Sequence, residues 1–175
     1  MLKKAEAGPS RERGAKPFRI LGLDPGLAST GWGLLEVSGN RLRYLAHGCI
    51  ETEASSPRAE RLFFIYREIC RVLETYKPRE GAVENLYFGR NVSSAMAVAE
   101  ARGVIILALV QQGLEVAEFT PGAIKTGVAG VSRAGKGQVQ EMVRLILGLE
   151  SIPKPDHAAD ALAAAICAAH SGPDL

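Results

Sequence analysis

The segment Ile20-Leu21-Gly22-Leu23-Asp24-Pro25-Gly26 is an apolar run that ends at an acidic residue and a turn signal. The run from Phe18 to Leu23 predicts a buried strand, and Pro25-Gly26 is typical of the turn that ends one. Asp24 is therefore expected at the end of the first strand. Its carboxylate either belongs to a functional site or accepts backbone N–H groups of the turn, and the sequence leaves both interpretations open.

Beyond this segment the chain predicts a three-strand meander followed by alternating helices and strands. We expect further strands at residues 31–37, 42–50, 81–84 and 114–119, helices at 57–77, 94–112, from 120 onward, at 136–147 and at 157–170, and a loop at 127–135. The turn Ser38-Gly39-Asn40 joins the second and third strands as a hairpin. This order predicts an α/β domain, a mixed five-stranded sheet flanked by helices.

The length of 175 residues fits one domain, which we place at residues 18–171. We expect residues 1–17 to be a flexible basic leader, because they have no apolar periodicity. Residues 1–19 hold six basic and two acidic side chains, a net +4, whereas the remaining 15 basic and 17 acidic residues give −2. The leader either contacts DNA or is a plain disordered segment, and a nucleic-acid surface on the domain itself must be a local patch.

Composition predicts a globular protein of the cytoplasm. Hydrophobic residues make up 47% of the chain and charged residues 23%. The longest apolar run, residues 103–110, is far shorter than the ~20 residues of a membrane-spanning helix, and no signal-like segment is found near Met1. The three cysteines are widely spaced, which favours reduced thiols over a disulfide framework or a zinc site. We therefore expect a cytoplasmic protein with no membrane partner.

A second lone carboxylate, Glu84, closes the fourth predicted strand. The preceding Ala82-Val83 is apolar, so the carboxylate is expected to lie close to the core. A carboxylate in such a position is unfavourable unless it is paired or bound to a metal. Glu84 is therefore a stronger candidate for a functional residue than Asp24 taken alone.

His157 and Asp160 lie three residues apart near the start of the last helix, so they share one face of it. Asp156 is expected to cap this helix, whereas Asp160 lies deeper than a cap requires and would face the sheet. A buried acid without a cation is improbable. Three carboxylates and an imidazole that converge favour a divalent cation such as Mg²⁺, and the reaction that this chemistry indicates is phosphodiester hydrolysis.

Five segments of the chain resemble motifs of the RuvC family of crossover junction endodeoxyribonucleases. They are residues 20–26, Val83-Glu84-Asn85, Ala101-Arg102-Gly103, residues 136–140 and residues 157–163. The resemblance runs from about Phe18 to His170, with the segments in the same order and spacing as in the family.

The resemblance implies a ribonuclease H-like fold and a homodimer. It also implies resolution of Holliday junctions, which are four-way DNA junctions, by paired symmetric nicks with Mg²⁺, in homologous recombination and DNA repair beside a branch-migration helicase complex. Asp24, Glu84, His157 and Asp160 match the four catalytic, metal-binding positions of the family. Many members carry Asp where this chain has His157, and others carry His. An imidazole suits transition metals, so Mn²⁺ is a possible substitute for Mg²⁺.

The segments that flank these positions are expected to contact DNA. Two consecutive aromatic residues either stack on unpaired bases at the branch point or pack in the core, and the family has a junction-contacting aromatic at the first of them. Residues 120–140 contain no acid, so their cations are free to contact phosphates, although a plain solvated surface is the alternative. The predicted DNA-binding residues are Tyr87, Phe88, Arg90, Asn91, Lys125, Arg133 and Lys136.

The helix predicted at residues 94–112 is apolar on every side, since residues 104–107 are four successive large aliphatic residues. A helix that lies on a sheet needs only one apolar face. Other helices of the chain could cover the second face, but the resemblance places the partner subunit of a homodimer there.

Three other functions compete with a junction nuclease. A nucleotide-binding domain of the actin and sugar-kinase type also has an Asp at the end of its first strand, but such proteins need two domains and this chain has length for one. A catalytically silent junction-binding module would leave the four site residues unexplained. An RNA-processing enzyme on the same fold is modestly disfavoured by the Lys136 segment and the aromatic pair.

Overall fold

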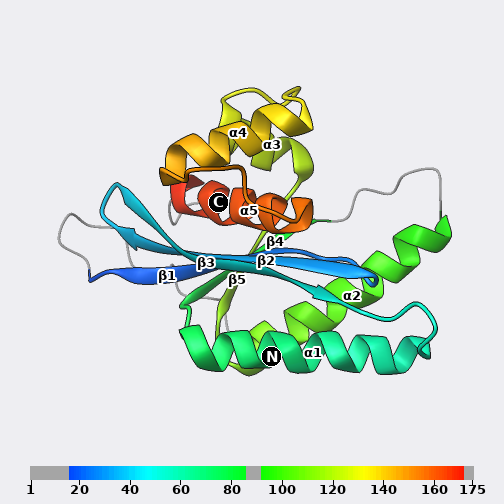
Figure 1. Ribbon diagram of the computed structural model, residues 1–175. Coiled ribbons are helices and arrows are strands. Elements are labelled where there is room, and N and C mark those ends of the chain that lie inside the picture. Colours follow the sequence, from blue (N-terminus) through cyan, green and yellow to red (C-terminus); the bar gives the residue numbers. More distant parts are fainter. Residues whose placement is uncertain (1–15, 86–91, 172–175) are drawn as a thin grey trace, which may run out of the picture.

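The computed structural model describes residues 16–85 and 92–171, apart from the side chains of residues 92–94 (Figure 1). The strands are β1 (Phe18–Asp24), β2 (Ser29–Ser38), β3 (Arg41–Glu51), β4 (Glu80–Glu84) and β5 (Glu115–Phe119), and the helices are α1 (Arg58–Tyr76), α2 (Val92–Gln111), α3 (Pro121–Ala129), α4 (Lys136–Leu147) and α5 (Asp156–Ser171). The predicted order of strands and helices is confirmed.

The five strands form one mixed sheet in the order β3-β2-β1-β4-β5. The pairs β1–β2 and β2–β3 are antiparallel, whereas β1–β4 and β4–β5 are parallel. Leu23 of β1 is in register with Val83 of β4, so both strands end at the same edge of the sheet. This register places Asp24 and Glu84, which follow them, side by side.

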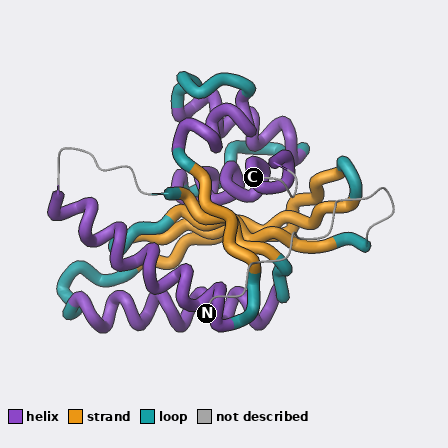
Figure 2. Tube along the Cα trace, turned by 180° about the vertical axis from the view of Figure 1, so that it is seen from behind, coloured by secondary structure: helices purple, strands orange, loops and turns teal. Residues whose placement is uncertain are grey.

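Helices cover both faces of the sheet. Helices α3, α4 and α5 lie on one face, and α1 and α2 lie on the other (Figures 1 and 2). Helix α5 packs directly on the strands, between the sheet and the pair α3 and α4. The residues from Ala161 to Ala168 are all buried, and most of them are alanines, which lets this helix pack between two layers at close range.

The contact between α5 and the sheet is a contact between backbones. A Cβ atom added at Gly22 would lie 1.9 Å from the carbonyl oxygen of Ala161, and one added at Gly31 would lie 2.0 Å from that of His157. No side chain other than glycine fits at these strand positions. The small residues of α5 and the glycines of β1 and β2 therefore fix the helix at close range over the strand ends.

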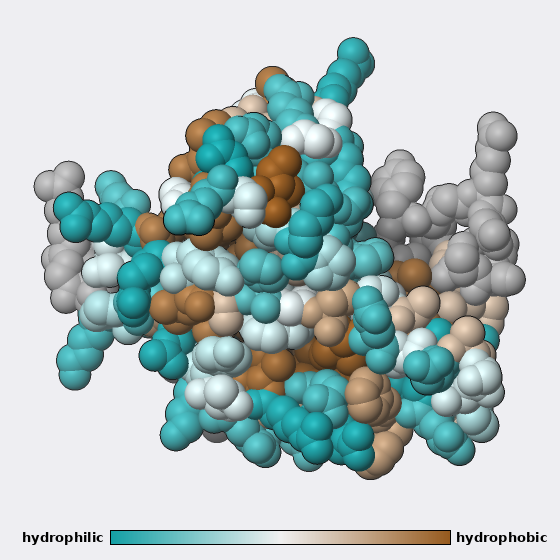
Figure 3. Space-filling model, viewed as in Figure 1, coloured by the Kyte–Doolittle hydropathy of each residue, from teal (hydrophilic) through white to brown (hydrophobic). Residues whose placement is uncertain are grey.

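Large aliphatic side chains fill the opposite face, where Ile65 and Ile69 of α1 meet Ile105 and Leu109 of α2 over Leu21. The outer side of α2 is uncovered in the single chain: the exposed fractions are 55% for Met96, 60% for Leu107 and 57% for Val110. From the side seen in Figure 3 the surface is mostly hydrophilic, with apolar patches around α3 and α4 and between the sheet and α1. Val131, which follows α3, and Leu145 of α4 are more than half exposed.

One local prediction was wrong. The segment that begins at Gly127 was expected to be a loop, but α3 continues to Ala129 and ends at Gly130, whose φ is 75°. A Cβ at Gly127 would lie 2.9 Å from the sulfur of Cys167, so this glycine allows α3 to pack closely on α5. Within the described residues, no helix combines the length and apolarity needed to span a membrane.

Candidate active site

The candidate site lies at the edge of the sheet where β1, β4 and the first turns of α5 meet. Asp24 ends β1, Glu84 ends β4, and His157 and Asp160 lie on α5. The imidazole Nδ1 of His157 is 2.7 Å from Oδ2 of Asp24, although 133 residues separate them in sequence. The fold thus brings these four residues to one region, as the sequence suggested.

The turn after Asp24 is held by a threonine. The buried hydroxyl of Thr30 donates to the Gly26 carbonyl at 2.7 Å and accepts from the Gly26 amide at 3.4 Å. Thr52 adds two bonds, from its hydroxyl to Leu27 O and from its amide to Ala28 O. An Asp at the start of a turn often accepts a backbone N–H of that turn, and here Thr30 accepts it instead. The carboxylate of Asp24 is therefore available to the site.

Negative charge is concentrated at this edge. Burial, the charges of Asp24 and Asp160, and a hydrogen bond to Asp24 raise the pKa of Glu84 to about 7. Burial also raises the pKa of Asp24, although its hydrogen bond to His157 and the charge of that ring oppose the rise. The carboxylates are desolvated and repel one another, an arrangement that a bound cation would relieve.

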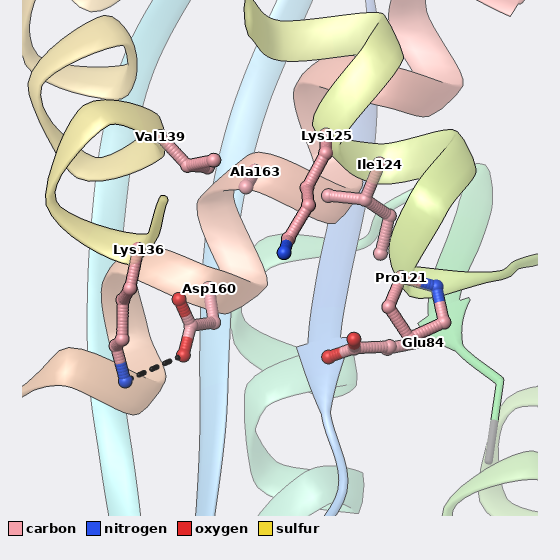
Figure 4. Close-up of a pocket in the computed structure, with 8 residues that line it drawn as sticks. All are labelled: Glu84, Pro121, Ile124, Lys125, Lys136, Val139, Asp160 and Ala163. Atoms are coloured by element: carbon pink, nitrogen blue, oxygen red, sulfur yellow. Dashed lines mark ion pairs between the residues drawn. The ribbon is translucent and has the colours of Figure 1, made fainter. Parts of the chain in front are cut away.

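Two lysines reach this site from α3 and α4. Lys136 Nζ lies 3.2 Å from Oδ2 of Asp160 and 3.4 Å from Oδ2 of Asp156. Burial lowers the pKa of Lys136, but the bonds to these two carboxylates outweigh it and the net pKa is raised. Lys125 extends from α3 into the space between Asp160 and Glu84, where its charge opposes the rise in the pKa of Glu84 (Figure 4).

These residues border an open cavity of about 240 Å³. Its apolar wall comes from α3, α4 and α5, and its polar groups are two carboxylates and two ammonium groups (Figure 4). The cavity is lined by Glu84, Pro121, Ile124, Lys125, Lys136, Val139, Asp160 and Ala163. An anionic group such as a phosphate could contact Lys125 and Lys136 and so lie close to the carboxylates.

Asp156, which the sequence suggested as the cap of the last helix, also forms ion pairs with two lysines. It is the first residue of α5, and its carboxylate pairs with Lys154 at 3.1 Å and with Lys136 at 3.4 Å. The bond to Lys154, and then that to Lys136, lowers the pKa of Asp156. The pair with Lys136 could not be predicted from the sequence, because that lysine lies 20 residues earlier, on another helix.

Part of the predicted DNA surface lies outside the described residues, namely Tyr87, Phe88, Arg90 and Asn91. Arg133 is exposed in the segment between α3 and α4 and does not line the cavity. Lys125 and Lys136 do line it, so of the three predicted DNA-binding residues that the structure describes, these two lie beside the carboxylates.

The donor set of the site consists of carboxylates and one imidazole. Within residues 16–85 and 92–171, no three His, Cys, Asp or Glu side chains already form a cluster arranged to hold a metal ion. Asp160 forms an ion pair with Lys136, and Asp24 lies within hydrogen-bond distance of His157. The donor chemistry nevertheless fits, because hard oxygen ligands under mutual repulsion, as at Glu84, are what Mg²⁺ and similar cations neutralise.

The sheet order and the carboxylates at the ends of β1, β4 and near the start of α5 define a ribonuclease H-like nuclease. Residues 20–168 match the family model described as crossover junction endodeoxyribonuclease RuvC. The chain therefore belongs to the RuvC family. This confirms the predicted fold and the predicted class of enzyme, an endonuclease, and it rules out the nucleotide-binding alternative.

Individual relatives agree with this assignment. The RuvC proteins of Treponema denticola and Heliobacterium modesticaldum are 52% and 53% identical over 147 and 152 residues; the matches cover 84% and 87% of this chain and 83% and 94% of theirs. The structure of Thermus thermophilus RuvC in complex with a Holliday junction substrate is 35% identical, with a TM-score of 0.83, and covers 87% of this chain and 93% of its own. Enzymes of this family depend on a divalent metal ion.

Proposed function

We propose that this chain resolves Holliday junctions by paired symmetric nicks, with Asp24, Glu84, His157 and Asp160 around a divalent cation. The observation that carries the proposal is the meeting of three acidic residues from β1, β4 and α5 at one edge, where burial and like charge raise the pKa of Glu84 to about 7. A fold that holds carboxylates against one another in this way is suited to a site that binds a cation.

Each residue has a role that follows from its position. His157 orients Asp24 through the bond to Nδ1, and Glu84 must be ionised to act as a ligand. When bound, the cation would supply Lewis acidity for hydrolysis of the phosphodiester. The oxygen donors favour Mg²⁺, whereas the imidazole of His157 also suits Mn²⁺, so Mn²⁺ is a possible substitute.

Junction DNA would contact the site through its phosphates and the lysines beside the carboxylates. Lys125 and Lys136 lie beside the carboxylates, where their charges can hold a phosphate of the cleaved strand. Arg133 would contact a phosphate farther from the site, and Tyr87 and Phe88 would stack on bases at the branch point, with Arg90 and Asn91 beside them. The Thermus thermophilus relative, whose structure is a complex with a Holliday junction substrate, supports junction DNA as the ligand.

The outer side of α2 is the proposed contact with a second copy of the chain. Met96, Leu107 and Val110 are each more than half exposed on a helix whose other side is packed in the core. A four-way junction has approximate two-fold symmetry. The two active sites of a two-fold dimer would be related by the same symmetry, so they could nick opposed strands at symmetric positions. The enzyme would act in homologous recombination and DNA repair in the cytoplasm, beside a branch-migration helicase complex.

The proposal is tested by incubating the purified protein with an end-labelled four-way junction and with a linear duplex of matched sequence, each with Mg²⁺, with Mn²⁺ and with chelator. We expect paired nicks at symmetric positions in the junction only, and only with metal. Equal cleavage of the linear duplex would contradict structure specificity. Cleavage that persists in chelator would contradict the metal site.

A further inference from the structure

Lys136 has two carboxylate partners, and only one of them belongs to the proposed metal site. Its ammonium group lies 3.2 Å from Asp160 and 3.4 Å from Asp156, both through Oδ2. Asp156 and Asp160 are four residues apart on α5 and therefore stand one above the other on the same side of the helix. The Lys136 ammonium lies between a predicted metal ligand and a carboxylate that the reaction does not use.

An ammonium group on Asp160 competes with a divalent cation for the same oxygens. Two positive centres a few ångströms apart repel each other, and the repulsion is strongest where water is partly excluded. The metal therefore binds most easily when Lys136 leaves Asp160. A lysine that lost its only ion pair in doing so would resist the change, whereas Lys136 already touches a second acceptor.

We propose that Asp156 is a positioning residue that holds Lys136 when a divalent cation occupies Asp160, so that the lysine exchanges one carboxylate for the other. The inference rests on the proposed metal site. In the metal-free protein Lys136 neutralises Asp160. With the cation present, the lysine turns to Asp156 and stays beside the site, where it can contact a phosphate of the DNA.

The segment before Asp156 holds this residue in place for the exchange. Its Oδ1 accepts a hydrogen bond from Lys154 at 3.1 Å, which leaves Oδ2 directed at Lys136. The backbone carbonyl of Lys154 in turn accepts a bond from Nε2 of His47 on β3, at 3.2 Å. His47 Nδ1 lies 2.9 Å from the Tyr44 hydroxyl, which fixes the ring.

A β-bulge makes the support from β3 possible. In the pairing of β2 with β3, Leu34 is opposite Ala46 and Leu35 is opposite Tyr44, so Leu45 is the extra residue. In a regular strand Tyr44 and His47, three residues apart, would point to opposite faces. The bulge restores them to one face, the face on which α5 lies, where they anchor the segment before Asp156.

The test is a cycle of variants in which metal binding is measured without DNA. Isothermal titration of Mn²⁺ and of Mg²⁺ is carried out on the wild type, Asp156→Asn, Lys136→Gln and the double variant. We expect Asp156→Asn to weaken metal binding about two- to fivefold, the effect of one exposed ion pair, because Lys136 then stays on Asp160. In the Lys136→Gln background the same change should have much less effect, since only the direct loss of a nearby charge remains.

Two further measurements separate the exchange from a general structural effect. Asp156→Glu keeps the charge and should restore part of the metal affinity. With junction DNA, Asp156→Asn should raise the metal concentration at half-maximal cleavage while the rate at saturating metal stays unchanged. An equal loss of affinity in both lysine backgrounds would overturn the exchange and leave the metal site standing. Absence of metal binding to the wild type would overturn both proposals.

Discussion

The two faces of the sheet are built from different kinds of side chain. On the α5 face, glycines of β1 and β2 lie so close to the helix that backbone touches backbone, as at Gly22 and Ala161 and at Gly31 and His157. On the α2 face, large aliphatic residues such as Ile105 and Leu109 separate helix from strand, and the far side of α2 is exposed.

The difference suggests that one face positions the active site and the other contacts a second subunit. Contact between backbones leaves no flexible side chain to adjust, so it fixes α5, and with it His157 and Asp160, relative to Asp24 on β1. Among the residues that the structure describes, α1 and α2 carry none of the candidate site, and the exposed apolar side of α2 suits a surface that joins another subunit. Changes on the first face should therefore affect catalysis and stability, and changes on the second should affect assembly.

The largest effect is expected from Asp24→Asn. The variant keeps the shape of the side chain and removes a metal ligand, so junction cleavage should fall by at least about 10³-fold while junction affinity is retained. Cleavage is measured with labelled junction and affinity by gel shift in chelator. Wild-type cleavage by this variant would remove Asp24 from the metal site.

A pair of glycine variants tests the two kinds of packing directly. Gly22→Ala would place a methyl group against the Ala161 carbonyl at 1.9 Å, and we expect a loss of at least about 3 kcal/mol in the free energy of unfolding. Gly81→Ala, on β4, meets only the end of the Leu109 side chain at 2.8 Å, so its effect should stay within about 1 kcal/mol. Urea unfolding measures both, and equal losses would contradict the contrast between the faces.

The exposed face of α2 is tested by Leu107→Glu. Burying this charge in a subunit interface is unfavourable, so the dimer dissociation constant should rise at least about 100-fold with the fold intact. Leu107 is preferred to its neighbour Ile106, which is half-buried in the single chain. Leu145→Glu on α4, at 55% exposure, is the matched control and should not change the sedimentation profile. A wild type that stays monomeric at micromolar concentration would refute the proposed interface.

The raised pKa of Glu84, which lies beside α5, predicts that the free energy of unfolding of the protein depends on pH. The folded protein holds this proton more tightly than the unfolded chain, because the pKa rises from 4.5 to about 7. In metal-free protein, stability is therefore lost as pH rises through this window. The side chain of Glu84→Gln cannot ionise. The free energy of unfolding of this variant should therefore exceed that of the wild type by about 2 kcal/mol near pH 8 and by almost nothing near pH 4.5. The value of about 2 kcal/mol allows for the partial exposure of Glu84.

Chemical unfolding at the two pH values, in chelator, measures this difference. A gain that is the same at both pH values would show that Glu84 does not titrate in this range. Saturating Mg²⁺ should remove most of the advantage of Glu84→Gln, because the cation stabilises the ionised wild-type carboxylate.

The smallest effect is expected from His157→Asp. Imidazole suits transition metals and carboxylate suits Mg²⁺, so this change should shift the ratio of Mn²⁺-supported to Mg²⁺-supported cleavage toward Mg²⁺ by about two- to tenfold. Rates at saturating concentrations of each metal give the ratio. An unchanged ratio would argue that His157 orients Asp24 without binding the metal itself.

Much of the fold could be predicted from the sequence, because local patterns carry it. The apolar run before Asp24, the hairpin at Gly39 and the helical spacing of the later segments depend on neighbours along the chain. The boundary of α3 could not be predicted, because Gly127 serves a contact with Cys167 on a helix 40 residues away.

The sequence by itself determined which residues were candidates for the chemistry: Asp24 and Glu84 at strand ends, and His157 and Asp160 on one helix face. The tertiary structure alone decided what each of them touches. That Thr30 holds the turn and frees Asp24, that Lys136 lies between Asp156 and Asp160, and that α2 keeps one apolar side exposed depend on distances between elements far apart in the chain. Such distances are set by the packing of helices on the sheet, which no periodicity within a single element records.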